Sequence, residues 1–131
     1  MSLSIASGPT DTPLIEQTIS ANLDATAARF PDREAMVDVV AGKRWTYAEL
    51  ARDVDVLARG FAGKGIVKGD RVGIWAPNCG EWTLVQYATA KIGAILVNIN
   101  PAYRTHELQY VLNQAGIKML VSAPSFKTSN Y

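Results

Sequence analysis

The sequence predicts an α/β fold, in which an incomplete, mostly parallel sheet carries flanking helices and a small β-hairpin. Two observations support this prediction. From Arg71 to Ser122, short apolar runs alternate with amphipathic stretches, and glycine or proline separates one from the next. Such alternation is typical of parallel βαβ units, whose crossovers are right-handed. We expect the two crossovers to run in one direction, which places both of their helices on the same face of the sheet.

The first part of the chain predicts a lead, a helix and a hairpin. Residues 1–17 are rich in Ser, Thr, Pro and Gly, which favours an extended or mobile lead. Apolar residues recur at helical spacing over Thr18–Phe30, and Pro31 ends that helix because the residue before a proline avoids helical geometry. Two short runs, Ala35–Val39 and Lys43–Trp45, surround a glycine and predict the hairpin.

Thr46 and Glu49 have the spacing of a capping box, in which a hydroxyl and a carboxylate each accept from a free amide of the first helical turn. They predict a helix whose apolar stripe covers Leu50–Phe61 and whose end lies at Gly63 and Gly65. We expect this helix to cover part of the second face of the sheet. Its charged residues are expected to face water, namely Arg52, Asp53, Asp55 and Arg59.

Residues that are typical of helix starts and helix ends also mark the two helices between the predicted parallel strands. Asn78 and Glu81 repeat the capping-box spacing and predict a helix that Gly93 ends in the left-handed conformation. Thr105 is the expected N-cap of a further helix, which ends at Gly116. Three apolar runs predict the parallel strands, namely Arg71–Trp75, Ile95–Ile99 and Lys118–Ser122.

Composition excludes several classes of function. The 13 Lys and Arg residues nearly balance the 12 Asp and Glu residues, so there is no electrostatic case for binding nucleic acid or a charged membrane surface. The apolar run Gly93–Val97 is far shorter than the roughly 20 residues that cross a bilayer. The single cysteine, Cys79, has no partner for an internal disulfide, which agrees with a cytoplasmic location. One His and one Cys do not make a zinc site.

Several residues that suggest chemistry have simpler structural interpretations. The segment Gly60–Gly65 has glycines beside a lysine, but a phosphate loop requires Gly and Ser or Thr where this chain has Ala58 and Gly65. We interpret it as a helix end. His106 is expected to lie on the surface, and Cys79 is expected to be a small packing residue. The prominent aromatic residues are assigned to the core, namely Trp45, Tyr47, Trp75 and Trp82.

One loop remains as a candidate ligand site. It follows the predicted strand Ile95–Ile99 at its carboxyl end, where parallel sheets bind their ligands. Pro101 restricts the path of this loop, and the guanidinium of Arg104 is suited to bind a phosphate. The alternative is that Tyr103 packs and Arg104 binds a neighbouring carbonyl. The candidate site residues are therefore Asn100, Pro101, Ala102, Tyr103 and Arg104.

The chain resembles a known family in five segments. Three are similar to the start of an adenylate-forming ligase: RWTYAEL at Arg44–Leu50, GDRVGI at Gly69–Ile74 and APN at Ala76–Asn78. Two are most similar to the fatty-acyl-CoA synthetase branch: AARFPDREA at Ala27–Ala35 and KIGAILVNINPAYR at Lys91–Arg104. Their order and spacing identify the chain as an N-terminal piece of a fatty-acyl-CoA synthetase in the AMP-binding superfamily.

The resemblance implies that residues 18–131 are the N-terminal part of an adenylation domain, which stops before the family's phosphate loop. The complete enzyme is then expected to convert a fatty acid, ATP-Mg²⁺ and coenzyme A to acyl-CoA, AMP and pyrophosphate through an acyl-adenylate. The resemblance also implies that Asn100–Arg104 lies along the entrance used by coenzyme A. The Mg²⁺-binding Glu and the catalytic Lys of the family lie downstream, so we expect these residues alone to be inactive and to hold no cofactor.

Alternatives stay open at this point. A non-catalytic α/β module used for assembly is one, and a stop codon after Tyr131 would favour it. Within the superfamily, an aryl-CoA ligase or an amino-acid adenylating domain is another, because the acid-binding pocket lies downstream. An unpaired sheet edge is expected to allow self-association. The predicted location is cytoplasmic or peripheral to a membrane.

Overall fold

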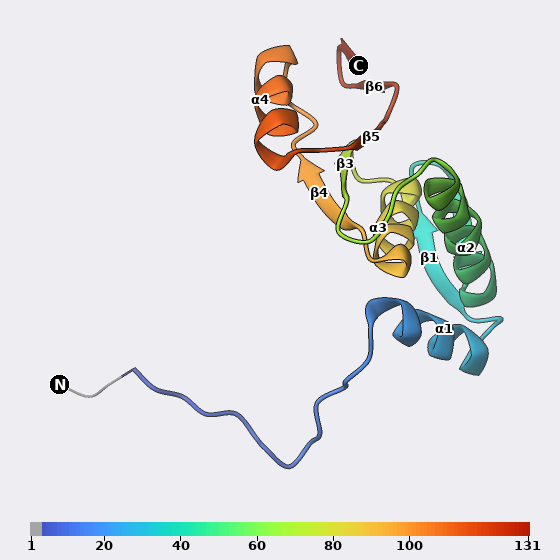
Figure 1. The fold of residues 1–131 in the computed structure, drawn as a ribbon. Coiled ribbons are helices and arrows are strands. Elements are labelled where there is room, and N and C mark those ends of the chain that lie inside the picture. The colour runs from blue at the N-terminus through green and yellow to red at the C-terminus, as the bar shows by residue number, and fades with distance from the viewer. Residues whose placement is uncertain (1–3) are drawn as a thin grey trace.

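The computed structural model describes residues 4–131 (Figure 1). Residues 4–18 are exposed, form no helix or strand and extend away from the rest (Figure 1). The helices and strands follow in the order α1 (Ile19–Arg29), β1 (Glu34–Asp38), β2 (Lys43–Thr46), α2 (Tyr47–Gly63), β3 (Arg71–Trp75), α3 (Gly80–Ile92), β4 (Ile95–Ile99), α4 (Thr105–Ala115), β5 (Met119–Ser122), β6 (Ser125–Phe126) and β7 (Ser129–Asn130).

The central sheet is parallel, as predicted, and its strand order is β4-β3-β5. The expected direction of the crossovers is wrong. The chain moves from β3 to β4 at one edge and then returns across β3 to reach β5 at the other edge. Since crossovers of one hand that run in opposite directions place their helices on opposite faces, α3 and α4 lie on opposite sides of the sheet (Figure 1).

The main core lies on the α3 side of the sheet. There α2 packs against α3, and α1 contacts both helices (Figure 1). Buried side chains of α2, β3 and α3 meet in this layer, including Val54, Val72, Ile74 and Ala88. The prediction that the helix after Thr46 covers the second face is therefore wrong, because its apolar stripe is used against α3.

The predicted hairpin is confirmed, with β1 and β2 antiparallel and Met36 opposite Trp45. The indole of Trp45 is buried against the start of α3. A Cβ atom on Gly80 would lie only 2.7 Å from Trp45 Cη2, so the glycine permits this close approach. The hairpin thus packs on the N-terminal end of α3.

The capping box of α2 is confirmed, but that of α3 is wrong. Thr46 Oγ1 accepts from the Glu49 amide at 3.2 Å, and Glu49 Oε2 accepts from the Thr46 amide at 2.9 Å. Cys79 is the N-cap of α3, and neither it nor Asn78 supplies a capping side chain there. Instead, Asp38 of the hairpin accepts from the Gly80 amide at 2.8 Å. A residue distant in sequence therefore caps α3.

The ends of α4 differ partly from the prediction. Arg104, and not Thr105, is the N-cap, and Glu107 Oε2 accepts from the Arg104 amide at 3.0 Å. Gly116 ends the helix in the left-handed conformation, with φ of 59°, as predicted. No residue of α4 is buried, so this helix covers its face of the sheet only loosely.

Of the four charged residues of α2 that were predicted to face water, two depart from the prediction. Arg52 and Arg59 are exposed, but Asp53 and Asp55 are only half exposed. Asp53 Oδ2 accepts from the indole Nε1 of Trp45 at 3.1 Å, and Asp55 forms an ion pair with Lys91 of α3. Both carboxylates therefore help to hold α2 against its neighbours.

Residues 124–131 show no strand pattern in the sequence, yet they form the short antiparallel hairpin β6–β7. Its turn includes Lys127 at a positive φ of 54°. Within residues 4–131, no helix combines the length and the apolar character needed to cross a membrane.

Candidate functional site

The three parallel strands end together at one edge of the sheet, and each is followed by a short loop. A proline stands two residues after the last residue of each strand, at Pro77, Pro101 and Pro124. A proline has no amide to donate to the sheet, so pairing stops at the same level in all three strands. These loops form the carboxyl edge of the sheet, where ligands of open parallel sheets bind.

The structure brings all five predicted site residues together at this edge. Asn100 organises the loop, because its Oδ1 accepts from the Ala102 amide at 2.9 Å and its carbonyl accepts from the Tyr103 amide at 3.0 Å. Pro101 and Tyr103 are half-buried, whereas Arg104 is exposed at the start of α4. The loop Asn100–Arg104 therefore has a defined turn that presents a cationic residue.

Two aromatic residues support this loop, and one of them was missed by the sequence analysis. Trp75 is buried, as expected, and its Nε1 donates to the carbonyl of Asn100 at 3.1 Å. Tyr131 stacks on Trp75, with 3.6 Å between ring centroids and 12° between the ring planes. The hydroxyl of Tyr131 donates to the carbonyl of Pro101. Nothing in the sequence around Tyr131 points to this contact, because it depends on the path of β6–β7.

Burial raises the pKa of the Tyr131 phenol, and the positive charge of Arg104 acts in the opposite direction. The phenol is therefore protonated at neutral pH and is available as a hydrogen-bond donor. Its hydroxyl joins the phenol to the loop Asn100–Arg104 at the carbonyl of Pro101.

Two adjacent cavities open at the carboxyl edge of the sheet and share Ala76, Pro77 and Trp82 in their walls. The first has a volume of about 390 Å³ and lies beside Asn100 and Pro101. The second has a volume of about 510 Å³ and reaches toward the exit of β5. Their walls are mainly apolar, so this edge is suited to an apolar or aromatic portion of a ligand.

Cys79 lines the second cavity but is not an activated nucleophile. Burial raises the pKa of its thiol, so the thiol form predominates at neutral pH. The side chain is half-buried between the hairpin and α3. Its position agrees with the packing role predicted from the sequence.

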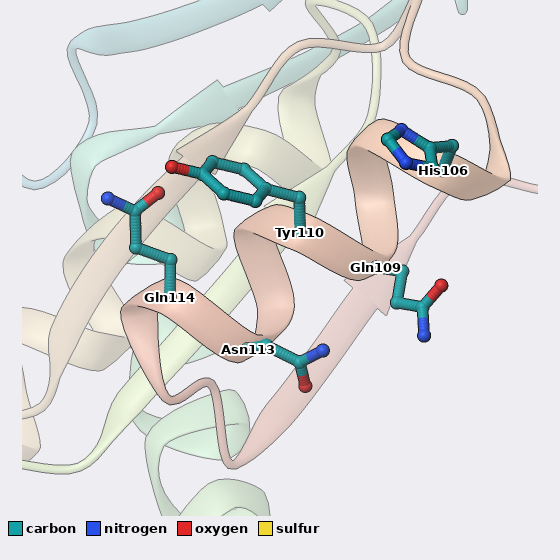
Figure 2. Close-up of a pocket in the computed structure, with 5 residues that line it drawn as sticks. All are labelled: His106, Gln109, Tyr110, Asn113 and Gln114. Carbon is teal, nitrogen blue, oxygen red and sulfur yellow. The ribbon is translucent and has the colours of Figure 1, made fainter.

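A further hollow of about 490 Å³ runs along the outer side of α4 (Figure 2). Every side chain that lines it comes from this one helix, and Figure 2 shows them spread outward from it: His106, Gln109, Tyr110, Asn113 and Gln114. Among residues 4–131, α4 alone contributes lining side chains to this hollow. His106 is exposed, as predicted.

The glycine-rich segment that suggested a phosphate loop has a structural role. The segment Gly60–Gly65 forms the end of α2, where the helix dipole disfavours an anion, so the helix-end interpretation is confirmed. Across residues 4–131, no three His, Cys, Asp or Glu side chains gather to hold a metal ion.

Comparison with known proteins decides the family. The chain matches the AMP-binding enzyme family over residues 23–130. The chain belongs to this family. The family resemblance and the α/β fold predicted from the sequence are therefore both confirmed.

Named relatives of this AMP-binding chain are acyl-CoA ligases. The medium-chain acyl-CoA ligase ACSF2, mitochondrial, of Mus musculus is 48% identical over 129 residues, which are 98% of this chain and 21% of the relative. The putative acyl-CoA synthetase YngI of Bacillus subtilis is 44% identical over 118 residues, which are 90% of this chain and 22% of the relative. The chain thus spans about a fifth of the length of these relatives.

Solved structures of AMP-binding enzymes share the fold. The N-terminal domain of FACL13 from Mycobacterium tuberculosis has a TM-score of 0.78 and 31% identity, with 81% of this chain and 27% of that chain covered. The N-terminal subdomain of NpsA from Klebsiella oxytoca, in complex with anthranilyl-AMSN, has a TM-score of 0.74 and 31% identity, with 80% and 27% covered. The first of these structures is described as an N-terminal domain and the second as an N-terminal subdomain.

Proposed function

We propose that this chain is the N-terminal part of an ATP-dependent fatty-acyl-CoA synthetase. The complete enzyme joins a fatty acid to coenzyme A through an acyl-adenylate and releases AMP and pyrophosphate. Residues 1–17 are the lead, and residues 18–131 are the first part of the AMP-binding domain, ahead of the phosphate loop. Support comes from the family match and from relatives that are named medium-chain acyl-CoA ligases.

The role of Asn100–Arg104 is to line the path by which coenzyme A reaches the acyl-adenylate. The observation that carries this assignment is the ordered loop at the carboxyl edge of the sheet, which begins at Asn100 and Pro101 in the wall of a mainly apolar cavity and ends at the exposed Arg104. Coenzyme A combines phosphates with a long, uncharged arm. A guanidinium suits the phosphates, and an apolar wall suits the arm.

Arg104→Ala in the complete protein tests this role. Loss of one charged phosphate contact costs about 1.5–3 kcal/mol, so the KM for coenzyme A should rise roughly tenfold or more. Acid-dependent pyrophosphate exchange should stay near wild type, because it precedes the entry of coenzyme A. Arg59→Ala removes the same charge from an exposed position of α2 and serves as the control. Equal damage to both steps would assign Arg104 to adenylation or to the scaffold.

Residues 1–131 alone should neither adenylate acids nor bind ATP tightly. The described residues contain no phosphate loop and no acidic cluster that fits Mg²⁺. ATP, Mg²⁺ and coenzyme A are therefore cofactors and substrates of the complete enzyme. Fatty-acid-dependent pyrophosphate exchange by the purified 131-residue chain would contradict this expectation.

Within the family, the main alternative to a fatty acid as the substrate is an aryl acid. An aryl acid is supported by the NpsA structure, which holds anthranilyl-AMSN. A medium-chain fatty acid has the stronger support, because the ACSF2 relative is 48% identical whereas NpsA is 31% identical. Pyrophosphate exchange by the complete protein with decanoate and with anthranilate separates the two. Faster exchange with anthranilate would favour the aryl-CoA ligase.

The remaining sequence predictions are retained as proposals. The outer edges of β4 and β5 allow the chain to self-associate by strand pairing. A cytoplasmic location stays a prediction, and the relative from Mus musculus is named as mitochondrial. A non-catalytic assembly module has less support than a ligase, because every relative described above is named as a ligase or synthetase.

A further inference from the structure

The last residues of the chain return to the exits of the parallel strands. After β5, the hairpin β6–β7 reverses direction, and the Tyr131 amide donates to the carbonyl of Pro124 at 3.1 Å. The exit of β5 is itself joined to β3, because the Ala123 amide donates to the carbonyl of Trp75 at 3.1 Å. The backbone of Tyr131 is therefore fixed beside the indole on which its ring stacks.

Two aromatic side chains bind two consecutive carbonyls of the candidate loop. Trp75 donates from its indole to Asn100, and Tyr131 donates from its hydroxyl to Pro101. Pro101 has no amide, so its carbonyl is the main-chain group by which this residue can be held. The other two hydrogen bonds of the turn, to Ala102 and Tyr103, lie within the loop and do not attach it to another element.

We propose that Trp75 and Tyr131 are positioning residues, which hold the loop Asn100–Arg104 in the orientation that receives coenzyme A. This inference rests on the proposed role of the loop. The stacked pair determines where the peptide planes of Asn100 and Pro101 point. Their orientation in turn determines where Arg104 begins α4. A loop held before the ligand arrives avoids part of the entropy cost of binding.

Tyr131→Phe separates this role from packing. The substitution keeps the stacked ring and removes only the hydroxyl that donates to Pro101. In the complete protein, hydrogen exchange of the loop amides of Ala102 and Tyr103 should become about three- to tenfold faster, which is the effect of one lost hydrogen bond. Trp75→Phe keeps an apolar ring, loses the donor to Asn100 and should act in the same direction.

Tyr110→Phe is the matched control, because Tyr110 is 61% exposed on α4 and makes no ring contact with the stacked pair among the described residues. This substitution should leave the hydrogen exchange of the Ala102 and Tyr103 amides at the wild-type rate. A change in loop exchange as large as that of Tyr131→Phe would overturn the proposal, since the effect would then not depend on the hydroxyl that binds Pro101.

Kinetics of the complete enzyme provide the functional readout. Tyr131→Phe should raise the KM for coenzyme A about three- to tenfold, with kcat and acid-dependent pyrophosphate exchange near wild type. If Arg104→Ala has no effect on this KM, the proposed role of the loop fails. If Arg104→Ala raises the KM but Tyr131→Phe changes neither the KM nor loop exchange, the loop keeps its role and the positioning inference alone is overturned.

Discussion

The two faces of the central sheet are built differently. On one face, α2 and α3 pack over β3 and form a core whose side chains are almost fully buried, including Val54, Val72 and Ile74. On the other face, α4 has no buried residue and exposes Tyr110 to 61%. Stability of the described residues is therefore expected to depend more on the α3 face than on the α4 face. Four predictions test this difference, in order of decreasing effect.

The first compares one aromatic residue from each face. Phe61→Ala removes a side chain that is 6% exposed in the core of α2, and it should lower the free energy of unfolding by about 3–5 kcal/mol. Tyr110→Ala removes a similar volume from α4 and should change it by about 0.5 kcal/mol or less. Urea unfolding followed by circular dichroism gives both values. Equal losses would show that α4 contributes to the core as much as α2 does.

The second prediction adds a methyl group to each side of the sheet. In Gly80→Ala the new Cβ meets the Trp45 indole at 2.7 Å, and in Gly73→Ala it meets Cδ1 of Ile117 at 2.9 Å. The buried indole is rigid, whereas the end of an isoleucine side chain can rotate. Gly80→Ala should therefore cost about 1–3 kcal/mol, and Gly73→Ala should cost less. Thermal unfolding shows which of the two substitutions lowers the stability more. A larger loss for Gly73→Ala would mean that the α4 face is the more tightly packed one.

The third prediction compares two threonines at helix starts. Thr46→Ala deletes the N-cap of α2 and should cost about 1 kcal/mol, with the catalytic constants of the complete enzyme unchanged. Thr105→Ala should cost much less, because Arg104 is the N-cap of α4. Denaturant unfolding of both variants is the measurement. A loss of turnover in Thr46→Ala at an unchanged melting temperature would show that Thr46 acts in the reaction.

The fourth prediction concerns the acid stability of the α3 face. The amides of Ala41 and Gly80 lower the pKa of the Asp38 carboxyl in the folded protein. A lowered folded pKa contributes stability above the unfolded pKa of about 4, and this contribution is lost as pH falls through the folded value. Asp38→Asn should therefore be less stable than wild type at pH 7 and should approach it near pH 3. A constant difference across this range would exclude the carboxylate as the source.

Local signals in the sequence were sufficient for the helices, the first hairpin and the three parallel strands. The predicted runs Arg71–Trp75 and Ile95–Ile99 are β3 and β4 without change, since each is a short apolar segment between strong turn signals. The capping box of Thr46 and Glu49 was also recognisable, because both partners lie within one turn. The order of the strands in the sheet was not recognisable from the sequence. The apolar pattern of a strand is the same whichever neighbouring strand the crossover leads to.

Long-range contacts explain the errors. Asn78 had the right spacing for a cap of α3, but the Gly80 amide donates to Asp38 of the hairpin instead. The hairpin β6–β7 was not predicted because its turn has Lys127 at positive φ, where sequence rules look for glycine or asparagine. The position of the candidate loop after a parallel strand was predicted correctly, whereas its role in binding a ligand stays a prediction. Its support by Tyr131 was not predictable, since it requires the path of that hairpin.

The central place of β3 has a consequence for synthesis on the ribosome. Its Val72 pairs with Leu96 on one side and with Met119 on the other, so both partners are translated after it. During elongation, β3 emerges with two unpaired edges, each able to recruit a strand from another chain. The helices α1 and α2 are already complete by then, so they are available to shelter its apolar side chains. Mistakes in assembly should therefore concentrate in the interval between the appearance of β3 and that of β5.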